Sequence, residues 1–197
     1  MDDKILSLVR GRRGHFQLES GHHGDLWLEL EALCLRPREL QPFAVRLAAA
    51  LRKYRVEVVC GPLVEGAYVA LLVSLELGCE FVYAERFVSP SREGLFPVEY
   101  RFPKALRSAV KGKRVAIVND VISAGSAVRG AFFDLQSIGA EVVVIGALLG
   151  LGDSIEKFAG ENHIALELLQ RMPHNLWTPE GCPLCAAGEP IEIASSS

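Results

Sequence analysis

The sequence lacks a long hydrophobic run and a marked excess of charge of one sign. Its longest uncharged apolar stretch, Val142 to Gly152, is shorter than the about 18 to 20 residues that a membrane-spanning helix needs. The 197 residues include 21 basic and 24 acidic side chains, and this slightly acidic balance argues against a nucleic-acid-binding protein. The charged start, Met1 to Lys4, does not resemble a secretory signal. We therefore expect a cytoplasmic protein that binds neither membranes nor nucleic acid.

The sequence also lacks an even set of cysteines, because it contains five. Three of them lie in apolar surroundings that suit buried thiols, so a disulfide framework is not favoured. Cys182 and Cys185 form a lone Cys-x₂-Cys pair, whereas zinc needs about four ligands and no second pair has matching spacing. The cysteines are therefore predicted to be reduced and structural, and no metal site is predicted in the protein itself.

Hydrophobic periodicity along the chain predicts an α/β fold. Apolar runs rich in β-branched residues, typical of strands covered on both faces, alternate with helical patterns. The predicted strands are 56–60, 81–84, 115–118 and 142–149, and the predicted crossover helices are 67–77 and 126–138. A further helix and strand are expected at 155–158 and 164–169. This alternation is the βαβ pattern of a doubly wound, mostly parallel sheet.

The remaining segments predict additions to that sheet within one domain that spans residues 1–197. A short helix at 5–9 and strand-like segments at 16–18 and 26–30 favour a small hood, built from about 1–35 and 165–197. Helical spacing predicts a helix at 42–53, with Pro42 in its first turn.

One connection is too long for an ordinary linker in a compact domain. Residues 87–112 contain three prolines and two glycines, which predicts a mobile functional loop. Residues 98–102 alternate weakly between apolar and polar, so part of this loop is expected to form a hairpin arm.

Polar and small side chains follow the predicted strand 115–118. Asn119 and Asp120 end it, and a tight loop of small residues then opens into a helix: Ser123, Ala124, Gly125, Ser126 and Ala127. Small residues and a helix N-terminus favour phosphate binding, and a carboxylate beside a phosphate needs hydroxyl groups to face. The pattern predicts a site for a sugar 5-phosphate, and its alternative is a turn in which Asp120 or Ser123 only caps the helix.

The stretch from Asp120 to Arg129, Asp-Val-Ile-Ser-Ala-Gly-Ser-Ala-Val-Arg, resembles a known signature. It is similar to the phosphoribosyl pyrophosphate (PRPP) motif of type I phosphoribosyltransferases, in the version of the orotate phosphoribosyltransferase family. A looser resemblance covers about residues 14–149, where residues 18–23 resemble the Ser-Gly turn of the family and residues 61–66 resemble its pyrophosphate loop.

The resemblance implies transfer of ribose 5-phosphate from PRPP, bound with Mg²⁺, to a pyrimidine base, with orotate as the leading candidate. It implies a five-stranded, mostly parallel sheet and a homodimer in which the long loop serves the neighbouring subunit. The implied catalytic residues are Asp120, Asn119 and Arg86, and residues 123–127 hold the phosphate. The implied pyrophosphate ligands are Gly61, Pro62, Glu65, Gly66, Arg92, Arg101 and Lys104, and the implied base ligands are Ser20, Gly21 and His23.

The sequence departs from the family pattern in its charges. Asn119 stands in place of a carboxylate, and Glu65 and Glu85 stand where basic residues are common. No arginine occurs between Arg129 and Arg171, although orotate enzymes place one there that grips the orotate carboxylate. Two alternatives therefore stay open: transfer to another nucleobase, and a noncatalytic domain that binds PRPP for regulation.

Overall fold

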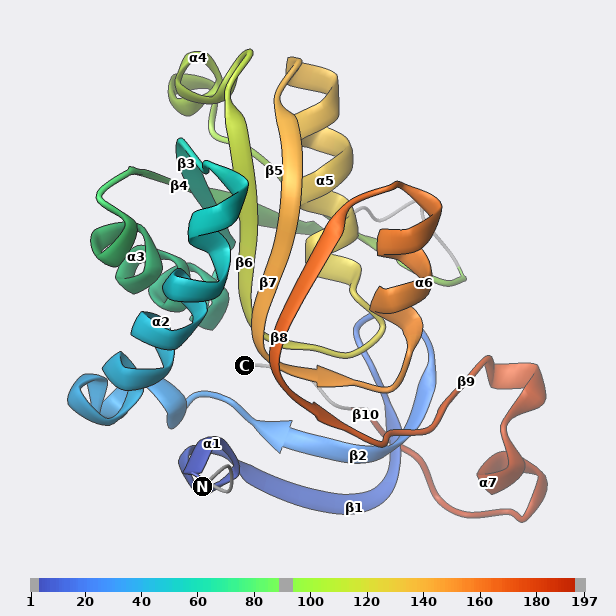
Figure 1. Cartoon of the computed structure of the whole chain (residues 1–197). Helices are drawn as coiled ribbons and strands as arrows, with labels where there is room; N and C mark the ends of the chain where they lie inside the picture. The colour runs from blue at the N-terminus through green and yellow to red at the C-terminus, as the bar shows by residue number, and fades with distance from the viewer. Residues whose placement is uncertain (1–3, 89–93, 194–197) are drawn as a thin grey trace.

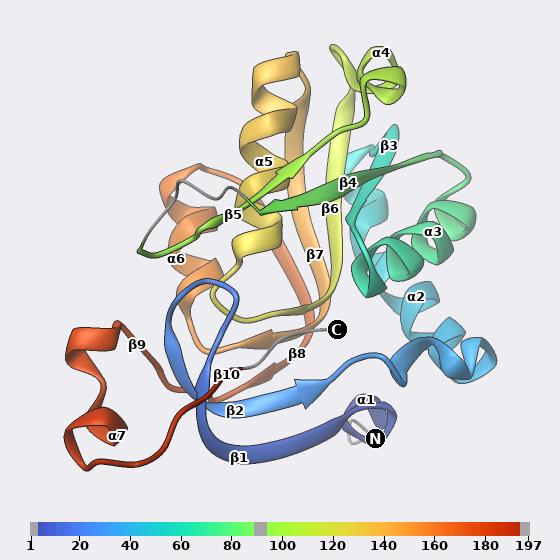
Figure 2. The same cartoon turned by 180° about the vertical axis from the view of Figure 1, so that it is seen from behind.

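The computed structural model describes residues 4–88 and 94–193, which build two sheets (Figures 1 and 2). The large sheet has six strands in the order β5-β4-β3-β6-β7-β8, and the small sheet has the order β10-β1-β2-β9. Within the described residues, no helix combines the length and the apolar composition that crossing a membrane requires.

The large sheet confirms the predicted α/β class. Its strands are β3 (Val58–Pro62), β4 (Glu80–Val88), β5 (Val98–Arg101), β6 (Arg114–Ile122), β7 (Glu141–Leu151) and β8 (Ala165–Met172). Five of them run parallel, as predicted, and β5 is a sixth that pairs antiparallel with β4. The centre of β6 and β7 is buried, which explains the nearly continuous β-branched runs there.

Helices cover both faces of this sheet (Figure 1). On one face, α2 (Pro37–Leu51) and α3 (Glu65–Leu77) bury their apolar residues in one core cluster. On the other face, α5 (Ser126–Ile138) and α6 (Ser154–Glu161) contribute to a second cluster. The shorter helical elements are α4 (Arg107–Val110) and the 3₁₀ turns Leu33–Leu35, Arg52–Tyr54, Lys104–Leu106 and Pro179–Gly181.

The predicted start of α2 was wrong. The helix begins at Pro37, five residues before Pro42, which lies inside it. Pro37 occupies the first helical position, where the missing N–H costs nothing, so the first of the two prolines marks the start. The apolar positions Phe43, Leu47 and Leu51 are buried, as the helical spacing predicts.

The small sheet forms the hood. It contains β1 (Arg10–Gln17), β2 (His23–Glu29), β9 (Leu176–Trp177) and β10 (Glu192–Ile193), flanked by α1 (Lys4–Leu8) and α7 (Pro183–Ala186). Strand β8 belongs to the large sheet, because it pairs with β7 over seven residue pairs, so the C-terminal part of the hood begins later than residue 165. In both views α7 lies at the outer end of the hood, beyond β9 and away from the large sheet (Figures 1 and 2).

The long connection contains regular structure. Its residues 89–93 lie outside the described part, but β5 forms the expected hairpin arm with β4. Asp134 of α5 anchors this arm: its carboxylate accepts hydrogen bonds from the backbone N–H of Phe102 at 2.7 Å and from the guanidinium of Arg107 at 2.8 Å. Figure 2 shows the hairpin crossing in front of α5.

Replacement of this anchor should destabilise the fold. We expect Asp134→Ala to lower the free energy of unfolding by about 1.5 to 3 kcal/mol, because it removes charge-assisted bonds and leaves the Phe102 N–H unpaired. The control is Glu141→Ala, which breaks an exposed pair with Arg114 and should cost about 0 to 1 kcal/mol. Urea denaturation measures both values, and equal effects of the two variants would contradict the anchoring role.

Candidate active site

A cavity of about 470 Å³ lies at the carboxyl edge of the parallel sheet. Three segments of the large sheet and its loops line it: the end of β6, the loop that follows it, and the connection from β3 to α3. The turn between β1 and β2 lines it from the hood, with Leu18, Glu19 and Ser20. Ligands in open α/β sheets bind at this edge, so the location agrees with a binding site.

The small-residue loop Ser123–Ala127 lines the cavity and leads directly into α5. Gly125 precedes the helix with φ +86°, a left-handed conformation that other residues rarely adopt. The carbonyl of Ala124 accepts hydrogen bonds from Arg129 Nε at 3.2 Å and from Ser154 Oγ at 3.0 Å. The hydroxyl of Ser123 is buried and has no hydrogen-bond partner among the described residues. The loop is thus braced on one side and has an unpaired donor for a ligand.

Asp120 is a buried carboxylate at the end of β6. Its side-chain oxygen Oδ2 has no hydrogen-bond partner among the described residues. Burial is the main cause that raises the pKa of Asp120 to about 7; the negative charge of Glu65 adds to it, and hydrogen bonds from the backbone N–H groups of Val121 and Asp120 act in the opposite direction. A buried oxygen without a partner costs free energy unless a ligand supplies one.

Asn119 lies in β6 against the start of α3. Its Nδ2 donates to the carbonyl of Val121 at 2.9 Å. A Cβ on Gly66 would lie 1.9 Å from Asn119 Oδ1, so only glycine permits the start of α3 to approach β6 this closely. The amide of Asn119 is therefore engaged within the protein, whereas Asp120 Oδ2 is unpaired.

The charges around the cavity are mostly negative. Among the described lining residues, Arg86 is the single cation, and the carboxylates are Glu19, Glu31, Glu65 and Asp120. Arg86 Nε donates to Glu19 at 2.7 Å, and the hydroxyl of Tyr100 donates to the same carboxylate at 3.1 Å. Sequence reasoning missed Glu19 and Tyr100, because their contact joins residues 81 positions apart and leaves no local pattern.

The structure brings together many of the predicted site residues. Those that line the cavity are Ser20, Pro62, Glu65, Gly66, Arg86, Asn119, Asp120 and all of 123–127. Gly61 lies one residue before them in β3, and Gly21 lies in the β1–β2 turn with φ +79°. His23 is buried in the hood, where it contacts His15 and Cys185 and does not line the cavity.

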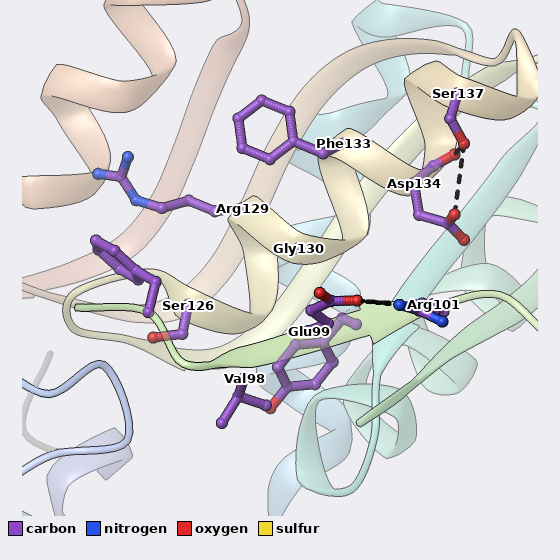
Figure 3. Close-up of a pocket in the computed structure, with 11 residues that line it drawn as sticks. Val98, Glu99, Arg101, Ser126, Arg129, Gly130, Phe133, Asp134 and Ser137 are labelled. Atoms are coloured by element: carbon purple, nitrogen blue, oxygen red, sulfur yellow. Dashed lines mark hydrogen bonds and ion pairs between the residues drawn. The ribbon is translucent and has the colours of Figure 1, made fainter. Parts of the chain in front are cut away.

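The cations predicted to bind pyrophosphate from the long loop are Arg92, Arg101 and Lys104, and the two that the structure describes lie outside the acidic cavity. A second cavity, of about 490 Å³, is lined by residues of β5 and α5, and Arg101 lines it beside Glu99 (Figure 3). Arg101 Nε donates to Glu99 Oε2 at 2.9 Å. Lys104 is exposed in the following 3₁₀ turn, and Arg92 lies outside the described residues. Neither Arg101 nor Lys104 lines the acidic cavity of its own chain.

Comparison with known proteins defines first the class and then the family. No protein-family model matches the chain. The crystal structure of orotate phosphoribosyltransferase from Aeropyrum pernix superposes with a TM-score of 0.64, covering 87% of this chain and 94% of that one at 23% identity. This likeness gives the chain the fold of a type I phosphoribosyltransferase.

Curated relatives are similar over nearly the whole chain. The orotate phosphoribosyltransferase of Thermotoga maritima is 30% identical over 185 residues, which cover 93% of this chain and 90% of the relative. That of Caldanaerobacter subterraneus subsp. tengcongensis is 28% identical over 193 residues, covering 96% and 94%. The chain belongs to the orotate phosphoribosyltransferase family, and the resemblance inferred from the motif 120–129 is confirmed.

The raised pKa of Asp120 predicts how stability depends on pH. In the unfolded chain this carboxyl ionises near its ordinary pKa of 3.8, whereas in the folded protein it ionises near 7. Between these values the folded state binds more protons, so the contribution of Asp120 to the free energy of unfolding falls as pH rises, by on the order of 2 to 4 kcal/mol. Asp120→Asn should remove this loss and stabilise the protein more at pH 8 than at pH 5.

Chemical denaturation of the ligand-free protein between pH 5 and pH 8 measures this difference. The control is Asp153→Asn, because Asp153 is exposed and its pair with Lys157 lowers its pKa, so it stays ionised throughout this range. Its effect on stability should not change between pH 5 and pH 8. If the free energies of unfolding of Asp120→Asn and the parent differed by the same amount from pH 5 to pH 8, the raised pKa of Asp120 would be contradicted.

Proposed function

We propose that the protein transfers ribose 5-phosphate from PRPP to a pyrimidine base, with orotate as the leading acceptor. In this reaction the bond from C1 of the ribose to pyrophosphate breaks and a bond from C1 to a ring nitrogen of the base forms. The observation that carries the proposal is the braced loop Ser123–Ala127 beside the unpaired Asp120, in one cavity at the carboxyl edge of the sheet. Family membership supports the same reaction.

Different segments of the cavity would bind different parts of the substrates. The loop Ser123–Ala127 would hold the 5-phosphate through backbone N–H groups and the Ser123 hydroxyl, next to the N-terminus of α5. Asp120 Oδ2 would accept hydrogen bonds from ribose hydroxyls, and Asn119, bonded to the Val121 carbonyl, would support the carboxyl end of β6. The connection Pro62–Gly66 lies where the leaving pyrophosphate would bind, and Ser20 and the neighbouring turn would contact the base.

The acidic cavity favours a substrate that arrives with Mg²⁺. Four carboxylates and one described cation would repel a free polyanion. The carboxylates of Asp120 and Glu65 fit Mg²⁺, which prefers oxygen ligands and is commonly bound by one or two carboxylates together with substrate phosphates. When bound, Mg²⁺ would neutralise charge that develops on the leaving pyrophosphate.

The position of the loop cations favours a homodimer. Lys104 and Arg101, two of the candidate cations for pyrophosphate, do not line the cavity of their own chain. A second copy of the chain would be needed to receive them, as the family resemblance implies.

The phosphate loop is tested by two matched glycine variants. Gly125→Val should weaken binding of ribose 5-phosphate at least about ten-fold, because a β-branched residue disfavours φ +86° and displaces the loop. Gly139→Val introduces the same strain at the other end of α5, at φ +84°, far from the cavity, and should bind like the parent. Calorimetry measures both affinities, and unchanged binding by folded Gly125→Val would refute this placement of the phosphate.

The accepting base is tested with a panel of nucleobases and Mg-PRPP, following pyrophosphate release and product mass. We expect orotate to be a substrate with a Michaelis constant above about 100 µM, because its carboxylate meets no arginine other than the Glu19-paired Arg86 among the described lining residues. Arg171 and Lys157 pair with Glu156 and Asp153 and do not line the cavity.

A variant with one carboxylate fewer checks the reason for this weak binding. Glu31→Gln should lower the Michaelis constant for orotate, because it removes negative charge at an exposed position of the cavity.

The nucleobase panel has three further outcomes. Efficient turnover of orotate by the parent at micromolar concentration would contradict the expected high Michaelis constant. If product forms with another base and not with orotate, the alternative of transfer to another nucleobase is supported. If PRPP binds but no base gives product, the alternative of a noncatalytic regulatory domain is supported.

A further inference from the structure

Two histidines and two cysteines meet in the hood, away from the acidic cavity. His15 and His23 come from β1 and β2, and Cys182 and Cys185 come from the start of α7, more than 150 residues later. The four potential ligand atoms, one on each side chain, all lie within 4.8 Å of one another. His15, His23 and Cys182 are buried, and Cys185 is exposed.

Four of the six distances between these atoms are close to those around one tetrahedral metal ion, and the other two are within 4.8 Å. His15 Nε2 lies 3.3 Å from His23 Nδ1, 3.4 Å from Cys182 Sγ and 3.6 Å from Cys185 Sγ, and Cys185 Sγ lies 3.2 Å from His23 Nδ1. Zinc bonds of about 2.3 Å to sulfur and about 2.0 to 2.1 Å to nitrogen place tetrahedral ligands about 3.3 to 3.8 Å apart. One ion can therefore contact all four atoms with little movement.

The backbone prepares His15 for this role. The register of β1 against β2 shifts between Arg13 and Phe16, and the resulting bulge buries both His15 and Phe16, although neighbouring residues of a regular strand face opposite sides. His15 Nδ1 lies 2.9 Å from the carbonyl of Glu189 and donates to it, which leaves Nε2 with a lone pair facing the cluster. Metal-binding histidines typically have such a second hydrogen bond.

The C-terminal segment has little else to hold it. In the described stretch from Thr178 to Ile193, Cys182 is the only buried residue and Leu184 is the only half-buried one. Its sheet pairing is limited to two residue pairs between β10 and β1, beside the exposed Arg12–Glu192 ion pair. A segment without its own apolar core needs a further constraint to stay ordered.

We propose that His15, His23, Cys182 and Cys185 bind a structural zinc ion that fastens the C-terminal segment to the hood. Two thiolates and two imidazoles at tetrahedral spacing are a donor set that zinc prefers. Four protein ligands complete the coordination and leave no open position, so the ion would be structural and not catalytic. The prediction that the Cys-x₂-Cys pair binds no metal considered only cysteine pairs, whereas the missing ligands are histidines brought in by the fold.

The site would also fix the turn that lines the cavity. His15 and His23 flank the segment Leu18–His22, whose ends are joined by a hydrogen bond from Leu18 N–H to the His22 carbonyl at 2.8 Å. An ion held by both histidines would restrain this turn at its base. The proposal itself depends only on the hood, so it stands or fails separately from the transferase activity.

Metal content of the full-length protein tests the proposal. After purification without chelators, brief incubation with zinc chloride and gel filtration, we expect about one zinc per chain by mass spectrometry of the metal. Titration with a mercurial thiol reagent should release that zinc from the unmodified protein. Cobalt in place of zinc should give the sulfur-to-cobalt charge-transfer bands of a tetrahedral thiolate site. No retained zinc, or an oxidised Cys182–Cys185 pair that excludes it, would overturn the proposal.

Variants locate the ion. Cys185→Ser changes an exposed ligand and should retain the fold by circular dichroism but lose zinc, whereas Cys79→Ser, a half-buried cysteine outside the cluster, should keep it. Limited proteolysis should cut residues 173–193 at least about ten-fold faster in Cys185→Ser than in Cys79→Ser. Zinc retained at the parental level by folded Cys185→Ser, or equal proteolysis of the two variants, would refute the assignment.

Discussion

The burial of Asp120 is the constraint around which the site is organised. Its carboxylate lies near the end of β6, whose residues 115–120 are buried, beside the negative charge of Glu65, and one oxygen has no partner among the described residues. Such a group costs stability in the ligand-free protein, and this cost is typical of positions that serve binding. The proposed partners, ribose hydroxyl groups and a divalent cation, would convert this cost into affinity.

The local parts of the site could be predicted from the sequence because their signals are local. Strand β6, the small-residue loop and helix α5 follow one another within 25 residues, and the helix has the predicted bounds Ser126–Ile138. The β-branched run, the glycine with positive φ and the helix N-terminus each leave a pattern of neighbouring residues. The predicted start of α2 was wrong because local signals were ambiguous there. Pro37 and Pro42 are both compatible with a first turn, and only packing selects between them.

Contacts between distant segments could not be predicted in this way. Glu19 accepts hydrogen bonds from Arg86 and Tyr100, which lie 67 and 81 positions away in the sequence, and no periodicity relates these residues. His15 and Cys182 meet across 167 positions, through a bulge that hydrophobic alternation does not encode. Arg101 was expected at the pyrophosphate, but the hairpin turns it toward the second cavity and Glu99. Charge and spacing identify candidate ligands, whereas the fold decides which of them share a site.

The hood and the large sheet meet at the cavity through a small number of polar contacts. Glu19 joins the β1–β2 turn to β4 and β5, and the Phe96 N–H donates to the Ser20 carbonyl at 2.8 Å. These bonds are partly exposed to solvent, so each contributes little to stability alone. Precise placement of Ser20 therefore also requires rigidity inside the hood. The histidine–cysteine cluster lies at the base of the same turn, where a metal would provide that rigidity without adding a group to the cavity.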